Sequence, residues 1–272
     1  MSALFQFFYS SPQLQKVHIN ISHEVLQDIP LDKVISLESL VELNYICHSA
    51  GRVLPCLKLP RLKRLLVSSS SGPGQIQKLA DILPYGGHLI LAGATKMSYH
   101  SNQYSFGIGF PGNEVEVSLC IFREIAADPI TVDWFSDQTW IPFGQIEDLK
   151  VEAYPIAGDP SISVFALENL RVLRITLHDT RFTEGFLHMF HPDPGAGIPC
   201  RSLQEIEYFT WGSPRPYLSP LIDLVRERKQ AGYQLGLVCI ILFAQEPDGD
   251  LGEELREYVG EVRVKVSWDG KV

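Results

Sequence analysis

One pattern of apolar and polar residues recurs along the chain. An apolar residue is followed by two polar or mixed residues and then by two apolar residues one position apart. The clearest copies cover residues 14–19, 40–45, 62–67, 146–151, 170–175 and 203–208, and a weaker copy covers 235–240. The last residues of each copy alternate, so each copy predicts a short strand with one apolar and one polar face.

The spacing of the copies predicts how the strands assemble. Successive copies start 26 residues apart (14 to 40), then 22 (40 to 62), and later 24 (146 to 170), 33 (170 to 203) and 32 (203 to 235). These intervals bracket the length of leucine-rich repeats but are irregular. One such strand cannot bury its own apolar face, whereas stacked parallel strands share a core. We therefore predict an α/β fold: an irregular leucine-rich-repeat solenoid, with parallel strands on one face and helices and loops on the other. We expect it to form one domain over residues 1–272.

The segments between the copies predict the remaining elements. Apolar residues at helical spacing predict helices over 75–83, 181–190, 220–231 and 251–259, and we expect further strands near 88–91, at 115–121 and at 262–266. The helix over 220–231 places Leu221, Leu224, Val225 and Arg228 along one side and ends at Gly232. We predict that the glycine-rich segments 71–74 and 106–112 are turns, because no Gly-Lys-Ser/Thr follows either of them.

Composition and charge exclude several classes of function. The chain is 45% hydrophobic and 20% charged, with a net charge of −9. Such an acidic chain is a poor general ligand for nucleic acid or an anionic membrane. Its five cysteines are widely spaced and include no C-x-x-C, which argues against a disulfide framework and a zinc site. With no signal-like start and no long apolar run, we expect an intracellular protein, cytoplasmic or nuclear.

Catalytic and metal-binding motifs are weak. His188 and His191 lie three residues apart, with His178, Asp193 and Cys200 nearby, but Pro192 ends the predicted helix there. No G-x-S-x-G or other nucleophile motif occurs. We predict a non-enzymatic protein without a metal or cofactor. An enzyme on an α/β scaffold stays open as an alternative, because a catalytic triad can assemble from distant residues.

The polar face of the predicted strands is the candidate binding surface. Its first position holds Lys16, Glu42, Arg64, Asp148, Val172 and Glu205, and two residues on stand His18, Asn44, Leu66, Lys150, Arg174 and Glu207. In a parallel ladder these residues are near neighbours, and such a surface can read a partner through charge complementarity. We assign all of them except Val172 to a surface that binds an unknown target protein. The alternative is that opposite charges on adjacent strands pair with each other.

Part of the chain resembles a known family. Residues 200–206, 221–232 and 253–259, with 57–66 earlier in the chain, are similar to F-box proteins with degenerate leucine-rich repeats, a family expanded in mushroom-forming fungi. The resemblance implies a substrate-recognition subunit of a cullin–RING ubiquitin ligase, in which the F-box docks to an adaptor and the repeats hold the target.

The chain departs from that family in one respect. The Leu-Pro-x-Glu start of an F-box, its helices and its Trp-containing end are not found, so no F-box is detected. We therefore expect contact with a ligase adaptor only if an F-box is supplied elsewhere. A truncated paralogue without an independent role remains a further alternative.

Overall fold

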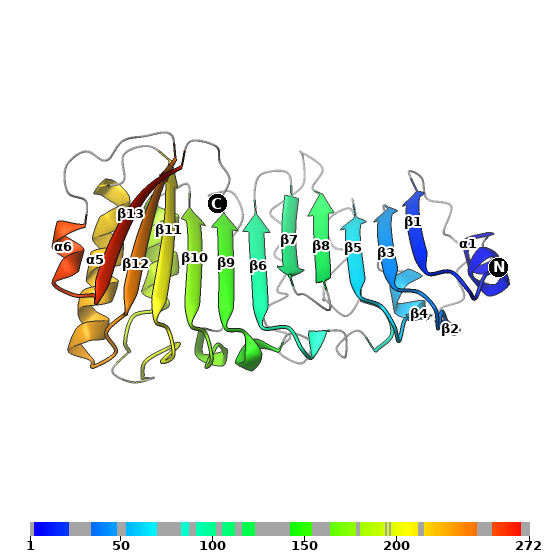
Figure 1. Ribbon diagram of the computed structural model, residues 1–272, viewed down its shortest axis with the longest axis horizontal. Coiled ribbons are helices and arrows are strands. Elements are labelled where there is room, and N and C mark those ends of the chain that lie inside the picture. The colour runs from blue at the N-terminus through cyan, green and yellow to red at the C-terminus, as the bar shows by residue number, and fades with distance from the viewer. Residues whose placement is uncertain are drawn as a thin grey trace. The chain divides into compact units, whose positions relative to one another are not determined.

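The computed structural model describes residues 3–21, 34–47, 53–69, 83–86, 91–101, 105–111, 116–122, 142–153, 164–177, 180–193, 195, 197–211, 215–243 and 252–267. The chain forms two compact units, and each is described by itself. Unit 1 comprises Met1–Pro142 and Ile156–Ser161, and unit 2 comprises Phe143–Pro155 and Ile162–Val272. Both contain mostly parallel strands, with helices at intervals (Figure 1), so the α/β class is confirmed. The single domain stays a prediction.

Unit 1 is a helix followed by strands. Its elements are α1 (Ala3–Ser10), β1 (Lys16–Ile21), β2 (Ile35–Ser36), β3 (Glu42–Cys47), the 3-10 helix η1 (Leu54–Cys56), β4 (Leu57–Lys58), β5 (Arg64–Ser69), β6 (Lys96–Ser101), β7 (Ser105–Phe110) and β8 (Glu116–Phe122). The strand order is β1-β3-β5-β8-β7-β6, in which β7 is antiparallel to β8 and β6. Strands β2 and β4 form a separate parallel ladder.

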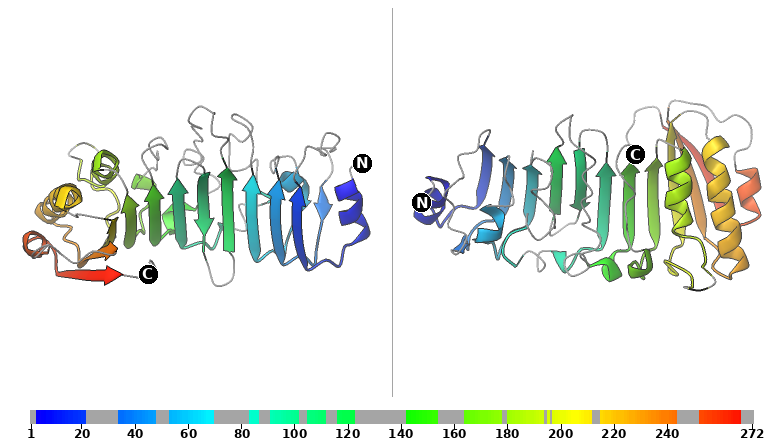
Figure 2. Two further views of the ribbon diagram at one scale, coloured as in Figure 1. Left: turned by 90° about the horizontal axis from the view of Figure 1, so that it is seen from above. Right: turned by 180° about the vertical axis from the view of Figure 1, so that it is seen from behind.

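Unit 2 is a run of parallel strands backed by helices. Its elements are η3 (Phe143–Gln145), β9 (Asp148–Ala153), η4 (Val164–Ala166), β10 (Val172–Leu177), α4 (Thr180–His188), β11 (Glu205–Trp211), α5 (Arg215–Gln230), β12 (Leu237–Phe243), α6 (Glu253–Arg256) and β13 (Glu261–Ser267). The strands pair in sequence order, from β9 to β13, and every pair is parallel. Helices α4 and α5 lie on one face of this sheet, as seen from behind in Figure 2.

The same turn leads into six of the predicted strands. The amide of the leading apolar residue donates to the carbonyl three residues earlier, at 3.0–3.3 Å, in the pairs Leu14–Ser11, Leu40–Leu37, Leu62–Leu59, Ile146–Phe143, Leu170–Leu167 and Leu203–Cys200. All of these leading residues except Leu14 are buried. The apolar residue that opens each sequence copy therefore anchors the chain just before it enters the sheet.

A second recurring contact joins five of these strands to the strand that follows. The carbonyl of Gln15 accepts hydrogen bonds from the amides of Val41 and Glu42, at 2.7 and 3.0 Å. The carbonyls of Val41, Glu147, Arg171 and Gln204 each accept two amides of the following strand in the same way. These shared acceptors hold consecutive strands in one register, so equivalent positions of the sequence pattern lie side by side.

Most predicted elements are confirmed. All seven copies of the pattern form strands, and 115–121 and 262–266 correspond to β8 and β13. Helix α4 matches the prediction for 181–190, whereas α5 begins at Arg215, before the predicted start, and contains Pro220. Helix α6 covers only Glu253–Arg256 of the predicted 251–259. Residues 75–82 of the helix predicted over 75–83 lie outside the described residues.

The structure differs from the expectations for β6, β7 and the segments before them. The turn predicted at 106–112 is wrong, because Ser105–Phe110 is strand β7. Its apolar residues alternate with glycines, so one face of the strand is apolar as in the other strands, but the second face has no polar side chains that would mark the alternation in the sequence. Strand β6 was not predicted. The strand expected near 88–91 is described only at Leu91, which precedes a turn, and the 71–74 segment lies outside the described residues.

The core of unit 2 confirms the predicted apolar side of α5. Leu221, Leu224 and Val225 are fully buried, and so is Arg228 on the same side of the helix. The helix ends before Gly232, whose φ of +84° suits glycine because it has no Cβ.

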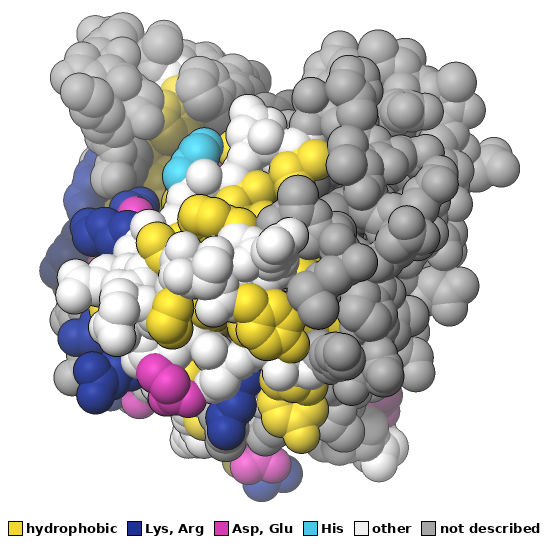
Figure 3. All heavy atoms as spheres, turned by 90° about the vertical axis from the view of Figure 1, so that its right-hand side faces the viewer, with side chains coloured by type: hydrophobic (Ala, Val, Ile, Leu, Met, Phe, Trp, Pro, Cys, Tyr) yellow, Lys and Arg dark blue, Asp and Glu magenta, His cyan; other side chains and the backbone are white. Residues whose placement is uncertain are grey.

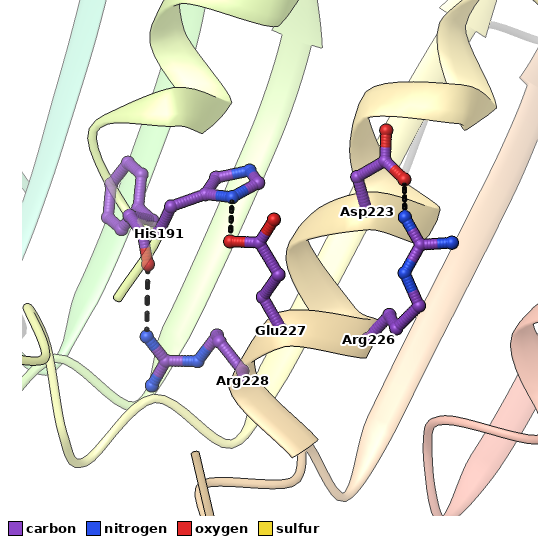
Figure 4. A network of polar contacts seen from close by, with 6 residues as sticks. His191, Asp223, Arg226, Glu227 and Arg228 are labelled. Atoms are coloured by element: carbon purple, nitrogen blue, oxygen red, sulfur yellow. Dashed lines mark hydrogen bonds and ion pairs between the residues drawn. The ribbon is translucent and has the colours of Figure 1, made fainter. Parts of the chain in front are cut away.

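Arg228 is a buried cation that ties α5 to the segment between α4 and β11. Its guanidinium donates to the carbonyls of Phe190 (3.3 Å), Pro199 (2.9 Å) and Cys200 (2.9 Å). Figure 4 shows its side chain reaching a backbone carbonyl, whereas Arg226 pairs with Asp223 along the helix. Burial lowers the pKa of Arg228 from its ordinary value. Through these three hydrogen bonds, Arg228 holds the segment between α4 and β11 against α5.

We predict that Arg228→Leu lowers the free energy of unfolding by about 2–4 kcal/mol, because buried carbonyls lose their donors. Urea denaturation measures the change. Arg226→Leu is the matched control, since its ion pair with Asp223 is solvent-exposed and is expected to contribute less than about 1 kcal/mol. Equal effects of the two substitutions would contradict the assignment of a structural role to Arg228.

We predict that Gly260→Ala destabilises unit 2 by about 1–3 kcal/mol through overpacking. A Cβ at Gly260 would lie 2.9 Å from the backbone oxygen of Gly236 in the preceding lead-in segment. Gly236→Ala is the control, because a Cβ there comes no nearer than 3.6 Å to the Gln204 oxygen. The melting temperature of Gly260→Ala should be lower than that of Gly236→Ala. The reverse order would show that the close approach of Gly260 to Gly236 is unimportant.

Candidate protein-binding surface

The predicted cross-strand alignment of the polar positions is confirmed. In unit 1, Lys16, Glu42 and Arg64 are register partners, as are His18, Asn44 and Leu66. In unit 2, Asp148, Val172 and Glu205 are partners, as are Lys150, Arg174 and Glu207. We call these residues the unit 1 row and the unit 2 row. Their role in binding stays a prediction.

Charges in the unit 1 row pair with each other. Glu42 lies between two cations, with its carboxylate 3.1 Å from Lys16 Nζ and 3.6 Å from a guanidinium nitrogen of Arg64. The Lys16 side chain is 76% exposed and that of Arg64 46%. Exposed pairs of this kind contribute about 1 kcal/mol or less. A partner's charged groups can therefore replace these contacts at little cost.

Arg174 is the centre of a tighter group in the unit 2 row. Its guanidinium forms ion pairs with Asp148 and with Glu207, the latter at 2.6 Å; both carboxylates are largely buried and Arg174 is half-buried. Burial by itself lowers the pKa of Arg174, but the hydrogen bonds and charges of Asp148 and Glu207 outweigh it and raise the pKa. In this group the charges on adjacent strands pair with each other, which was the alternative to a partner-binding role.

Lys150 differs from its neighbours. It lies on β9 beside Arg174, its side chain is exposed, and no ion pair or hydrogen bond joins it to another described residue. His18, in the unit 1 row, is also exposed. These two are the predicted site residues most accessible to a partner without loss of an internal ion pair.

The face that carries Arg174 becomes apolar toward β12. Phe209, Cys239, Ile241 and Phe243 form a buried cluster, and the rings of Phe209 and Phe243 stack with centroids 6.1 Å apart. By strand alternation these residues lie on the same face as Glu207. The sequence prediction missed this cluster. Its signal was the unbroken apolar run of β12, Leu237–Phe243, which is typical of a strand buried on both faces.

Cys200 is unsuited to nucleophilic chemistry. Cys56, Cys200 and Cys239 are buried free thiols. Burial raises the pKa of Cys239, and it raises that of Cys200 to about 12 despite the nearby Arg228 charge. The Cys200 thiol donates to the Val164 carbonyl at 3.2 Å. A thiol with this pKa is almost wholly protonated at neutral pH, so it is a poor nucleophile.

The histidines considered as metal ligands form a different contact. His191 Nδ1 lies 2.7 Å from a Glu227 carboxylate oxygen on α5 (Figure 4), and the rings of His188 and His191 are 5.4 Å apart. His178 lies outside the described residues. Within the described ranges, no group of three or more His, Cys, Asp or Glu side chains is arranged to hold a metal ion.

Comparisons with known proteins give no relative from which a function can be transferred. No family model, no curated protein and no solved structure matches the chain. Among the described helices, none has the length and apolar character needed to cross a membrane. The candidate surface therefore rests on the geometry of the chain itself.

We predict that Cys200 resists alkylation in the folded protein, because its thiol is buried and its pKa is raised to about 12. Iodoacetamide at pH 8 should label Cys200 in urea but not in buffer, as followed by peptide mass spectrometry. Arg228→Leu serves as a second sample, in which loosening of this segment should increase labelling. Rapid labelling of Cys200 in the folded wild-type protein would contradict this prediction and would indicate a reactive thiol.

Proposed function

We propose that the chain is a non-catalytic protein-interaction module whose stacked strands hold a target protein. The observation that supports this most directly is the common register of equivalent positions within each unit. Such a register presents side chains from consecutive strands as one surface, so a partner meets several of them at once. Charged side chains in such rows contribute more to the orientation of the partner and to the association rate than to the affinity.

We further propose that the architecture is an irregular leucine-rich-repeat solenoid. The recurring lead-in turn and the carbonyls shared by consecutive strands support this, because they repeat with the sequence pattern. The antiparallel strand β7 and the four-residue α6 are the main departures from regular repeats. In repeat proteins the exposed sheet surface is commonly the binding surface.

The sequence resemblance suggests a particular setting for this module. F-box subunits of cullin–RING ubiquitin ligases divide the work between an F-box, which docks to the adaptor, and repeats, which hold the substrate. We propose the second role for this chain, and assign adaptor contact only to an F-box supplied elsewhere. The proposed partner is therefore a protein substrate.

Lys150 is the best single residue with which to test the surface. Reversing Arg64 or Arg174 would also break ion pairs inside the protein, so a loss of binding would have two explanations. Lys150 is exposed and has no such contact among the described residues. Its reversal changes the surface alone.

We predict that Lys150→Glu weakens binding of a captured partner by about tenfold, or about 1.4 kcal/mol, without lowering thermal stability. Partners are first isolated with the wild-type chain, and the affinity of one purified partner is then measured for each variant. Arg201→Glu makes the same change of charge at an exposed position in the turn before β11, away from the strand face. If binding is unchanged by Lys150→Glu, or falls equally with Arg201→Glu, the unit 2 row is not the binding surface.

A further inference from the structure

Charge is unevenly distributed along the chain. Residues 43–113 contain seven of the 23 Lys and Arg residues but a single acid, Asp81, of the 32 Asp and Glu residues. This stretch therefore has a net charge of +6, and the remainder of the chain has a net charge of −15. A basic stretch in an otherwise acidic chain is suited to contact with an anionic partner.

Four of these cations lie within seven residues of unit 1. All four are exposed: Lys58 on β4, Arg61 in the turn before β5, Lys63 directly before β5, and Arg64 at its start. We call Lys58, Arg61 and Lys63 the basic turn, and leave out Arg64 because it already contacts Glu42. Seen from the end that carries α1, unit 1 has Lys and Arg side chains at its surface (Figure 3).

Buried leucines and backbone hydrogen bonds fix the basic turn in place. Leu57, Leu59 and Leu62 stand between the cations in the sequence and are at most 6% exposed. The Leu62 amide donates to the Leu59 carbonyl at 3.2 Å, and the Lys63 amide donates to the Val41 carbonyl at 2.8 Å. The cations therefore extend from an ordered backbone, which reduces the entropy lost when a partner binds.

The basic turn has no counter-ion in the part of the chain that the structure describes. No ion pair or hydrogen bond joins any of its three side chains to another described residue. Nearby, the Glu42 carboxylate contacts Lys16 and Arg64, and Glu38 accepts a hydrogen bond from Ser36 at 2.5 Å. Three exposed positive charges are thus left without a paired carboxylate.

The equivalent turns of unit 2 are different. Arg171 stands at the pattern position of Lys63, and its guanidinium donates to the side-chain oxygen of Gln204 in the next turn, at 3.5 Å. Asn169 donates to a backbone carbonyl of the preceding turn. These polar side chains join one turn to another, whereas those of the basic turn do not.

An exposed tyrosine lies beside the basic turn. Tyr85 is 60% exposed, and its amide donates to the Leu57 carbonyl at 2.8 Å. This contact aligns Tyr85 with Lys58 in a parallel bridge. A tyrosine offers apolar contact area and a phenol that can donate a hydrogen bond. The site therefore presents more than charge to a partner.

We propose that the basic turn binds a short acidic segment of the target protein, which rests on the proposed function. Lys58 and Lys63 are five positions apart, so their Cα atoms are separated by at most about 18 Å, the length of about five residues of an extended peptide. A segment of that length with several carboxylates matches the three cations. The net charge of −15 on the remainder of the chain repels a long polyanion such as nucleic acid more strongly than a short peptide.

The test measures binding of a synthetic peptide to the full-length chain. The probe is a fluorescein-labelled peptide with five consecutive glutamates, and the matched peptide has five glutamines in their place. Fluorescence anisotropy at about 50 mM salt should show at least about tenfold tighter binding of the glutamate peptide. The difference should shrink at about 300 mM salt, because salt screens contacts between exposed charges.

Charge reversal identifies the site on the chain. Lys63→Glu should weaken binding of the glutamate peptide at least about fivefold, and Lys63→Gln should weaken it by a smaller factor. Arg171→Glu is the matched control, because Arg171 is exposed at the same pattern position in unit 2, and this variant should bind like the wild-type chain. Circular dichroism melts check that each variant is folded.

Three results would overturn the proposal. They are equal binding of the two peptides, equal losses with Lys63→Glu and Arg171→Glu, and binding of a single-stranded RNA that is tighter than that of the glutamate peptide and is lost in Lys63→Glu. The last result would instead indicate a nucleic-acid site. The peptide assay does not use the captured partner, so its failure is distinguishable from a failure of the proposed function, which Lys150→Glu tests.

Discussion

The parallel hydrogen-bonded register of consecutive strands is the constraint on which most of the described structure depends. Side chains alternate along a strand, so a slip of one residue would exchange the buried and exposed faces. Carbonyls such as those of Gln15 and Glu147, which accept two amides from the next strand, hold that register at the point where each strand begins. The buried leading residues act at the same point. Recurring turns and recurring apolar residues thus specify one alignment.

Unit 2 shows where this arrangement changes. At β12 both faces are buried, so polar and apolar residues no longer alternate across the strand. Helix α5 covers one face, and its Arg228 places a cation in the core instead of another leucine. That cation is tolerated because backbone carbonyls from the preceding segment receive its protons. The helix and the segment therefore depend on each other.

The sequence predicted the elements whose signal is local. Each copy of the pattern contains its own anchor and its own alternation, so the strands and their mutual alignment could be read without knowing the partners. Strand β6 has the same lead-in turn, in which the Ala94 amide donates to the Leu91 carbonyl, but Ala94 is a small and only half-buried leading residue, so its sequence signal is weak. The pairing of β5 with β8 joins strands that are not consecutive. The buried side of α5 was predicted, but the carbonyls around Arg228 belong to a distant segment and carry no sequence signal. The sequence also could not show which charged residues of the candidate surface form ion pairs within the chain, because that depends on the distances between their side chains.

The residues of the candidate surface differ in how much internal stabilisation is lost when a partner engages them. A binding partner that draws Arg174 away leaves two largely buried carboxylates without their counter-ion, which costs more than an exposed contact returns. Lys16 can turn toward a partner with little loss, because its side chain is 76% exposed at its contact with Glu42. Lys150 has no internal contact to lose among the described residues. Recognition by the unit 1 row is therefore expected to rely on Lys16, and recognition by the unit 2 row on Lys150, while the Arg174 group holds β10 beside the strand that carries Lys150.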